Sequence, residues 1–191
     1  MGDPKKQKKK YDTPSHPWQK ARIDSERVIV EEYGIKNKTE LWKASSQLRH
    51  FKEQAKKYAS ATGAHADMQK QLFLKKLVTL GLIKDSGATD DILSLELKDI
   101  LNRRLQTIVV KKKLAATAKQ ARQFIVHNHI AISGRKLNVP GYIVRKAEED
   151  KIEFSQKSSL AKEDNPERVA IANRKEKPKR ERPQRRERRR R

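Results

Sequence analysis

The feature that most constrains this chain is a stretch of its second half that contains no acidic residue. Between Ile100 and Ala147 there is no Asp or Glu, while eleven Lys and Arg side chains fall in the same window. Apolar residues run through it from Leu105 to Val144, so the window can fold around a core of its own. A compact element whose surface charge has a single sign predicts a polyanionic partner.

The first part of this window has helical periodicity. Apolar residues keep helical spacing over 101–109. A capping-box pattern, Thr117-x-x-Gln120, then predicts a helix from Ala118 to about His127. Asn128 tolerates the left-handed backbone conformation and is predicted to close that helix.

After Asn128 the apolar spacing changes to period two. Strands are predicted over 129–132, 137–139, 142–144 and 151–154, with a Ser133-Gly134 turn after the first. The sequence therefore predicts an α+β module of two helices followed by a small, strongly bent antiparallel sheet.

The first hundred residues predict a helical domain behind a basic arm. Five lysines and three prolines precede Trp18 without apolar periodicity, which favours an extended arm over 1–21. A short helix is predicted from Asp24 or Ser25 to Tyr33, where Gly34 ends it. The next is a long helix capped by Thr39, with one apolar stripe from Leu41 to Ala59.

A third helix is predicted over 66–80, and its buried side chains are expected to include Met68, Leu72, Phe73 and Leu77. A short helical turn starts at Thr89, and a further helix leads from about Lys98 into the acid-free window. We therefore expect a helical domain over 22–101, a second domain over 102–154 and a basic, largely extended tail over 155–191. A short helix at 167–173 is the one element expected inside that tail.

The charge of the whole chain favours nucleic acid over an anionic membrane. The formal net charge is +23, from 47 Lys and Arg against 24 Asp and Glu, and each cation that neutralises a phosphate releases a counterion. A membrane partner would call for an amphipathic helix with bulky apolar anchors, and none is separate from the predicted core. No apolar signal region begins the sequence and no run approaches the ~18 apolar residues of a membrane span, so we expect a soluble, cytoplasmic protein.

The acid-free window closely resembles the S4 RNA-binding domain, which is named after the fourth protein of the small ribosomal subunit. The segments that carry the resemblance are Arg-Arg-Leu-Gln-Thr at 103–107, 112–115, Thr-Ala-Lys-Gln-Ala-Arg-Gln at 117–123, 127–134 and 139–144. Lys113 and Asn128 stand where the family has glycine. Asn accepts positive φ readily, whereas Lys in a left-handed conformation is strained by about 1–2 kcal/mol.

Motifs outside the window extend the resemblance. Segments 9–18, 33–42 and 148–152 are similar to the archaeal and eukaryotic branch of the ribosomal protein family from which the domain takes its name. The last forty residues lie outside the resemblance. The absence of cysteine excludes the zinc that some bacterial members hold.

The resemblance implies a structural protein of the small ribosomal subunit that binds its 16S ribosomal RNA directly. It also implies a role in nucleating assembly of the subunit body, an influence on decoding accuracy, and a position beside the messenger RNA entrance and the fifth small-subunit protein. No cofactor, small-molecule substrate or membrane is implied.

The predicted RNA-binding residues are cations and short hydrogen-bond donors of the window, types that suit the phosphates and 2′-hydroxyls of RNA helices. They are Arg103, Arg104, Gln106, Thr107, Lys111, Lys112, Lys113, Thr117, Lys119, Gln120, Arg122, Gln123, His127, Arg135 and Lys136. The alternative for the helix positions is a solvated basic face, and for Arg135 and Lys136 ordinary turn residues.

No catalytic or metal site is predicted. His127 and His129 lack the further ligands of a closed metal site, since there is no cysteine and no carboxylate near them in the sequence. An RNA-modifying enzyme such as a pseudouridine synthase carries the same module but needs a further catalytic domain, for which the remaining chain is too short and too basic. A free RNA chaperone that binds structured RNA off the ribosome stays an alternative.

The tail from Arg174 to Arg191 generates a prediction from composition alone. It has twelve basic and three acidic residues, a net charge of +9, and no apolar residue. Deleting it is expected to lower affinity for RNA with little loss of specificity, because such a tail contacts phosphates rather than base edges. Filter binding to a 5′-domain fragment of small-subunit ribosomal RNA and to a scrambled RNA of equal length measures affinity and specificity. A loss of affinity confined to the ribosomal fragment would contradict the prediction.

Overall fold

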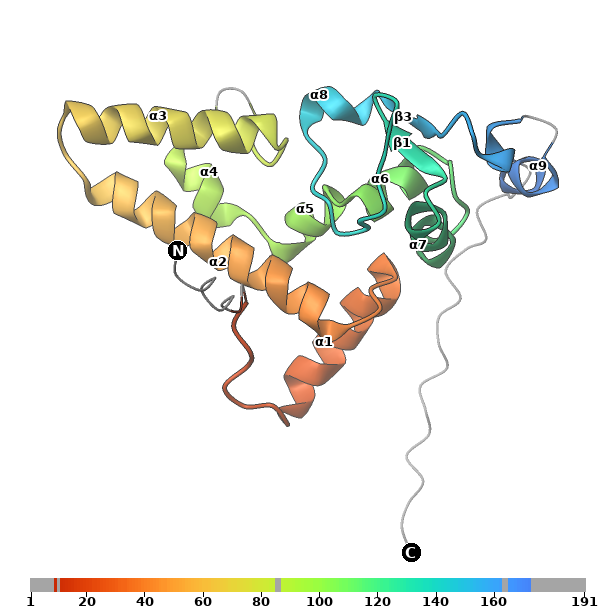
Figure 1. The fold of residues 1–191 in the computed structure, drawn as a ribbon. Helices are drawn as coiled ribbons and strands as arrows, with labels where there is room; N and C mark the ends of the chain where they lie inside the picture. The colour runs from red at the N-terminus through yellow and green to blue at the C-terminus, as the bar shows by residue number, and fades with distance from the viewer. Residues whose placement is uncertain (1–8, 10, 85–86, 163–164, 173–191) are drawn as a thin grey trace, which may run out of the picture.

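The structure, a computed structural model, describes residue 9 and residues 11–84, 87–162 and 165–172 (Figure 1). The last part of the predicted basic tail, 174–191, and most lysines of the predicted arm lie outside this part of the chain. The described part is mostly helical and holds one small antiparallel sheet. Two apolar cores form, one from residues 33–101 and one from residues 105–160. The α+β class predicted from the sequence is confirmed.

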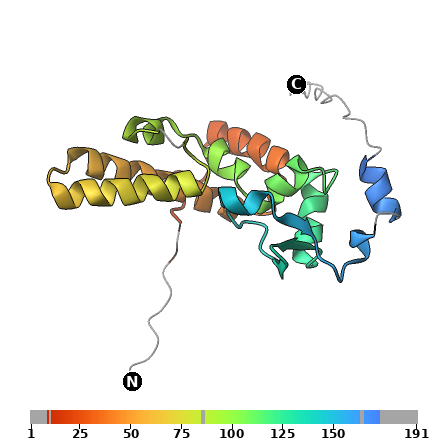
Figure 2. The ribbon, with the colours of Figure 1, turned by 90° about the horizontal axis from the view of Figure 1, so that it is seen from above.

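The first core is enclosed by five helices: α1 (Lys20–Tyr33), α2 (Lys38–Ser60), α3 (Ala64–Thr79), α4 (Thr89–Ser94) and α5 (Leu97–Asn102). Helices α2 and α3 form a hairpin that extends away from the sheet in both views (Figures 1 and 2). The predicted stripe on α2 is confirmed at Leu41, Ala44, Phe51 and Ala55, which are all buried.

Helices α1 and α2 begin earlier than predicted, and so does α3, which starts at Ala64 rather than at residue 66. Helix α1 starts at Lys20 rather than after Asp24, because Arg22 donates to the backbone oxygens of His16 and Pro17 and pairs with Glu26 one turn on. Helix α2 starts at Lys38, one residue before its predicted cap Thr39. The predicted arm therefore turns into helix just before its expected end.

The prediction that Met68 and Leu72 are buried is wrong. Their exposed fractions are 57% and 60%, whereas Phe73 and Leu77 of the same helix are buried. Helix α3 packs against α2 on one narrow side, so only the residues facing that side enter the core. The apolar stripe of α3 is wider than the surface that covers it among the described residues.

The second core is enclosed by α6 (Leu105–Lys111), α7 (Ala118–Val126) and the sheet of β1 (Ile130–Ile132), β2 (Arg135–Lys136) and β3 (Ile152–Phe154). The strand order is β2-β1-β3, and both pairings are antiparallel. The turn between β1 and β2 has left-handed residues at Ser133 (φ 49°) and Gly134 (φ 78°), as its sequence predicts.

The strands predicted over 137–139 and 142–144 do not form. This segment is an irregular loop, with one isolated bridge between Ile143 and Arg104. Leu137 N–H still donates to the Ile130 oxygen of β1, but the backbone of the second half bonds to the junction of α5 and α6: Leu105 N–H donates to the Tyr142 oxygen at 2.7 Å, and Val144 N–H donates to the Arg103 oxygen at 2.9 Å. A helical turn that the sequence did not indicate, α8 (Lys146–Glu149), follows the loop.

Among the described residues, the ends of four helices share one backbone geometry. After α1, α3, α6 and α7 the chain turns through left-handed residues Gly34 (φ 60°), Gly81 (φ 68°), Lys113 (φ 57°) and Asn128 (φ 60°). At each, the next N–H donates back five residues, as from Leu114 to the Val109 oxygen (3.1 Å) and from His129 to the Phe124 oxygen (2.9 Å). This is the Schellman motif. The glycine-type geometry is thus retained at Lys113 and Asn128.

The packed chain continues past Phe154. Leu160, in a 3-10 turn η1 (Ser159–Ala161), is buried in the second core. The short helix predicted over 167–173 corresponds to α9 (Pro166–Ala172).

The left-handed backbone conformation of Lys113 predicts an effect on stability. Lys113→Gly is expected to raise the free energy of unfolding by about 0.5–1 kcal/mol, because glycine has no Cβ penalty at positive φ but gains entropy in the unfolded chain. Chemical unfolding of the full chain measures the change. Lys111→Gly, two residues earlier at the end of α6, is the matched control and is expected to lower the free energy of unfolding by about 1 kcal/mol. If both substitutions changed the free energy of unfolding equally, Lys113 would not be strained by its left-handed backbone conformation.

Candidate nucleic-acid interface

The two cores are joined by a carboxylate of α2 that binds two arginines of the acid-free window. Glu40 Oε2 accepts from Arg104 Nη2 at 2.7 Å. The Arg122 guanidinium of α7 donates to both carboxylate oxygens, at 2.6 Å to Oε1 and 3.1 Å to Oε2. The Arg104 side chain is 6% exposed and those of Glu40 and Arg122 are 23% exposed. This Glu40 network is a charge-assisted contact largely removed from water.

The pKa of the Glu40 carboxyl reflects this setting. Burial on its own raises the pKa, but the hydrogen bonds and charges of Arg122 and Arg104 outweigh it and hold the pKa below its ordinary value of 4.5. The carboxylate is therefore ionised in the folded state at neutral pH.

Gln106 makes a second connection between the two parts. Its Nε2 donates to the backbone oxygens of Ala118 (2.7 Å), Gly34 (3.0 Å) and Tyr33 (3.3 Å). Gly34 has φ 60° and lies so close to α7 that a Cβ there would meet the Ala118 Cβ at 2.7 Å. Only glycine satisfies both the turn and this close approach.

Several of the predicted RNA-binding residues are thus engaged inside the protein. Gln106 and Arg104 are only 1% and 5% exposed, and Arg122 faces Glu40. Arg103 pairs with Glu149 of α8 at 2.6 Å and donates to the Val144 oxygen at 3.0 Å. The Thr107 hydroxyl donates to the Leu101 oxygen at 2.7 Å. The structure gives these side chains positioning contacts that the sequence did not reveal.

Two predicted residues form the start of α7. Thr117 Oγ1 accepts from Gln120 N–H at 3.2 Å, which is the predicted cap. Gln120 Oε1 reaches back to Ala116 N–H at 2.9 Å rather than to the N-cap residue itself. The local pattern therefore sets where α7 begins.

The remaining predicted residues face solvent. Lys111 and Lys113 at the end of α6 are exposed, and Lys112 between them is half-buried. The exposed side chains elsewhere are Lys119, Gln123, His127, Arg135 and Lys136. None of these cations forms an ion pair with a residue in the described part of the chain.

Three of the exposed residues follow one line on α7. Lys119, Gln123 and His127 recur every four residues and so lie along the same side of the helix. The lysines at the end of α6 precede α7 by one short turn, and α6 packs directly against α7. Arg135 and Lys136 lie on the edge strand β2. We name Lys111, Lys113, Lys119, Gln123, His127, Arg135 and Lys136 the exposed donor set.

The acids that bind the arginines come from outside the window, which is why sequence reasoning missed them. Glu40 precedes Arg122 by 82 residues and Glu149 follows Arg103 by 46. The local signal was the absence of acids, and one buried and two partly buried guanidinium groups in such a window require partners from other elements.

Residues of the predicted arm lie against α2. Asp12 pairs with Arg49 at 3.0 Å and its N–H donates to Ser46 Oγ at 2.9 Å, while the Tyr11 ring packs beside Trp42. Trp18, at the turn before α1, is 90% exposed.

The described residues contain no group of three His, Cys, Asp or Glu side chains arranged to hold a metal ion. Within the same ranges, no helix is both long and apolar enough to cross a membrane.

Comparison with known proteins identifies the family. Residues 103–152 match the S4 domain family. The small ribosomal subunit protein uS4 of Methanococcus maripaludis strain C7 is 50% identical over 173 residues, which cover 89% of this chain and 96% of the relative. The uS4 of Methanococcus aeolicus is 48% identical over 170 residues (88% and 96%), and that of Methanothermobacter thermautotrophicus is 44% identical over 163 residues (85% and 95%). The chain belongs to the uS4 family.

The family match covers both parts of the fold. The S4 domain match begins at Arg103, where the second core starts, and ends at Ile152 in β3. The similarity to uS4 proteins spans nearly the whole chain, so it includes the α2 segment that carries Glu40 as well as the S4 domain.

The Glu40 network predicts a pH-dependent stability. The folded pKa of Glu40 is lowered, so its stabilisation is complete above the ordinary carboxyl value and is lost as pH falls through the lowered value. Glu40→Gln is expected to lower the free energy of unfolding at pH 7 by about 2 kcal/mol, because it leaves the Arg104 guanidinium without its charged partner.

Urea unfolding of the wild-type chain and of Glu40→Gln at pH 7 and near pH 3 measures this contribution. The difference between the two proteins is expected to shrink at the lower pH. Glu53→Gln, an exposed glutamate of the same helix, is the control and is expected to have little effect. A Glu40→Gln variant as stable as wild type at pH 7 would show that the network does not hold the two parts together.

Proposed function

We propose that this chain is a structural protein of the small ribosomal subunit that binds the subunit's 16S ribosomal RNA directly through the exposed donor set. The observation that carries this is the division between paired and unpaired cations in the S4 domain. Arg103, Arg104 and Arg122 bind acids of the protein. The exposed lysines of α6 and α7 have no ion pair within the described ranges and are free to neutralise phosphates.

The chemistry of the donor set fits RNA. Lysine ammonium groups provide point charges for phosphate oxygens, and the Gln123 carboxamide and His127 imidazole provide donors for 2′-hydroxyl groups. Such contacts set the position of an RNA helix without reading its sequence. We therefore assign specificity to the shape of the RNA that fits against α6, α7 and β2 together.

The rigid connection between the two parts supports an architectural role. The Glu40 network and Gln106 fix the helical part and the S4 domain at one relative angle. A protein that binds RNA through both parts would fix RNA elements relative to each other. Nucleation of subunit assembly, an influence on decoding accuracy, and contact with messenger RNA and the fifth small-subunit protein are part of this proposal, as is location in the cytoplasm.

A free RNA chaperone is the second candidate, and the names of the relatives do not favour it. The two differ in where the protein is found. A structural constituent co-sediments in equal amount with the small subunit and survives a moderate salt wash. A chaperone is recovered mainly in the unbound fraction, and that result would overturn the proposal.

Lys119→Ala tests the surface itself. It is expected to weaken binding to a 5′-domain fragment of small-subunit ribosomal RNA by about fivefold and to reduce the magnitude of the salt slope by about one, because one phosphate contact is lost. Titrations at several salt concentrations measure both quantities.

Lys119→Arg retains the charge and is the matched control, expected to bind like wild type. Arg122 is unsuitable for this test because its replacement also breaks the Glu40 network. Unchanged affinity and salt slope in Lys119→Ala would remove α7 from the interface.

A further inference from the structure

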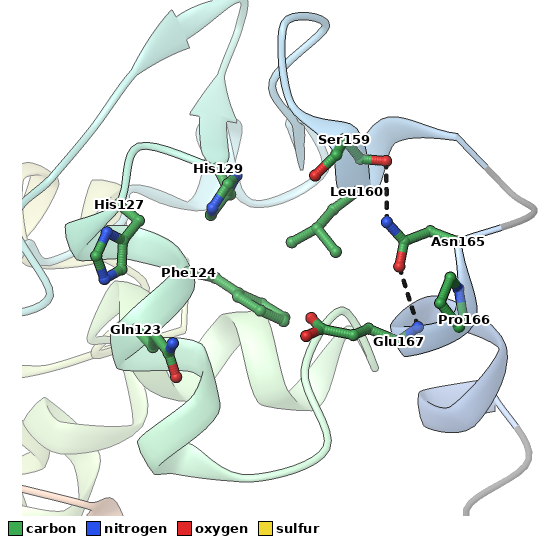
Figure 3. Close-up of a pocket in the computed structure, with 9 residues that line it drawn as sticks. All are labelled: Gln123, Phe124, His127, His129, Ser159, Leu160, Asn165, Pro166 and Glu167. Carbon is green, nitrogen blue, oxygen red and sulfur yellow. Dashed lines mark hydrogen bonds between the residues drawn. The ribbon is translucent and has the colours of Figure 1, made fainter.

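The C-terminal end of α7 borders a hollow that the donor set does not explain. A cavity of 430 Å³ lies between α7 and the segment that carries η1 and α9 (Figure 3). Its volume falls in the range of roughly 300–1,000 Å³ that holds small organic ligands. Its lining comes from the end of α7 and from residues 159–167, so the cavity forms only where the segment that follows the S4 domain packs against α7.

The base of the hollow is apolar and aromatic. Phe124 of α7 and Leu160 of η1 are each 5% exposed and both line it. The His129 ring packs edge-on against Phe124, with centroids 6.1 Å apart, and its Nδ1 lies 2.8 Å from Ser158 Oγ. Aromatic and aliphatic surface of this kind receives a flat ring that has left its own stack.

One wall of the hollow presents a carboxylate. Asn165 fixes this wall: its Nδ2 donates to the Ser159 oxygen at 3.2 Å, and its Oδ1 accepts from Glu167 N–H at 3.0 Å. Figure 3 shows the Glu167 carboxylate turned toward the interior of the hollow. It forms no ion pair with any residue that the structure describes.

The line of donors on α7 leads to this hollow. Lys119, Gln123 and His127 lie along one side of the helix, and the last two also line the cavity. A nucleic-acid strand that follows the donors therefore reaches the cavity mouth. A carboxylate beside that path repels phosphate and accepts hydrogen bonds, so it suits a ligand group that donates them.

We propose that the hollow is a subsite for one unpaired guanine of the RNA, extruded from its stack. This inference rests on the proposed RNA-binding function. The base would lie over Phe124 and Leu160, with its Watson–Crick edge toward Glu167. Guanine presents adjacent N1–H and N2–H donors on that edge, and the two acceptor oxygens of a carboxylate match them. Adenine, cytosine and uracil each present one donor group there.

The experiment uses the full chain, a 5′-domain fragment of small-subunit ribosomal RNA, and kethoxal, a reagent that attacks N1 and N2 of unpaired guanine. A guanine in the subsite is protected in the complex and reactive in free RNA. Glu167→Gln replaces one acceptor oxygen with a donor, so the same guanine is expected to regain reactivity, and the affinity to fall by about tenfold.

Glu153→Gln on β3 is the matched control. It removes the same charge from an exposed residue that does not line the cavity. If charge alone acted, both substitutions would strengthen RNA binding slightly by removing repulsion. The subsite instead predicts that Glu167→Gln weakens RNA binding while Glu153→Gln strengthens it slightly.

Each outcome decides the proposal. Loss of protection at one guanine in Glu167→Gln, with the rest of the footprint unchanged, supports the subsite. A full wild-type footprint that Glu167→Gln leaves intact overturns the subsite while the proposed function stands. A wild-type chain that leaves no footprint on the fragment overturns both.

Discussion

The Glu40 carboxylate on α2 connects the helical part of the molecule to the S4 domain. Glu40 lies between two arginines that arise 18 residues apart in the S4 domain, Arg104 and Arg122, and it accepts a hydrogen bond from each guanidinium at 2.7 Å or less. Without this acid, the acid-free window would bury a guanidinium against its own positive field. The S4 domain therefore takes the charged partner of Arg104 and Arg122 from the helical part, and this contact fixes its placement against α2.

The basic residues of the window fall into two groups, one paired inside the protein and one exposed to solvent, and the exposed group also contains Arg135 and Arg145. The arginines at 103, 104 and 122 bind protein carboxylates and carbonyls, where a planar fork of donors suits fixed, partly dry geometry. The lysines at 111, 113 and 119 face solvent, where a flexible and strongly hydrated charge suits phosphates of varied position. A count of positive charge along the sequence treats the two groups alike, although the fold uses them differently.

Local patterns predicted the elements well, and long-range partners account for what they missed. The cap at Thr117, the left-handed closure at Asn128 and the stripe on α2 follow from neighbours in the sequence, and each is present. Strands were predicted over 137–139 and 142–144, but the backbone of the second segment bonds to the α5–α6 junction, which no local pattern contains. The contacts of two predicted site residues were missed for the same reason: Gln106 and Arg104 are residue types common on surfaces, and contacts with elements distant in the sequence, among them α1 and α2, bury them.

Because the chain passes so close to α7 at Gly34, a small change of angle there would be amplified at the far end of the hairpin of α2 and α3. Helix α2 has 23 residues, roughly 35 Å of length, and its first turn carries Glu40 beside this contact. A side chain at position 34 would act as a wedge between α1 and α7, and a tilt of about 5° there would move the far end of the hairpin by roughly 3 Å over that length. A substitution that changes no surface charge can therefore misplace a distant RNA contact. The geometry of binding is set where the two halves touch.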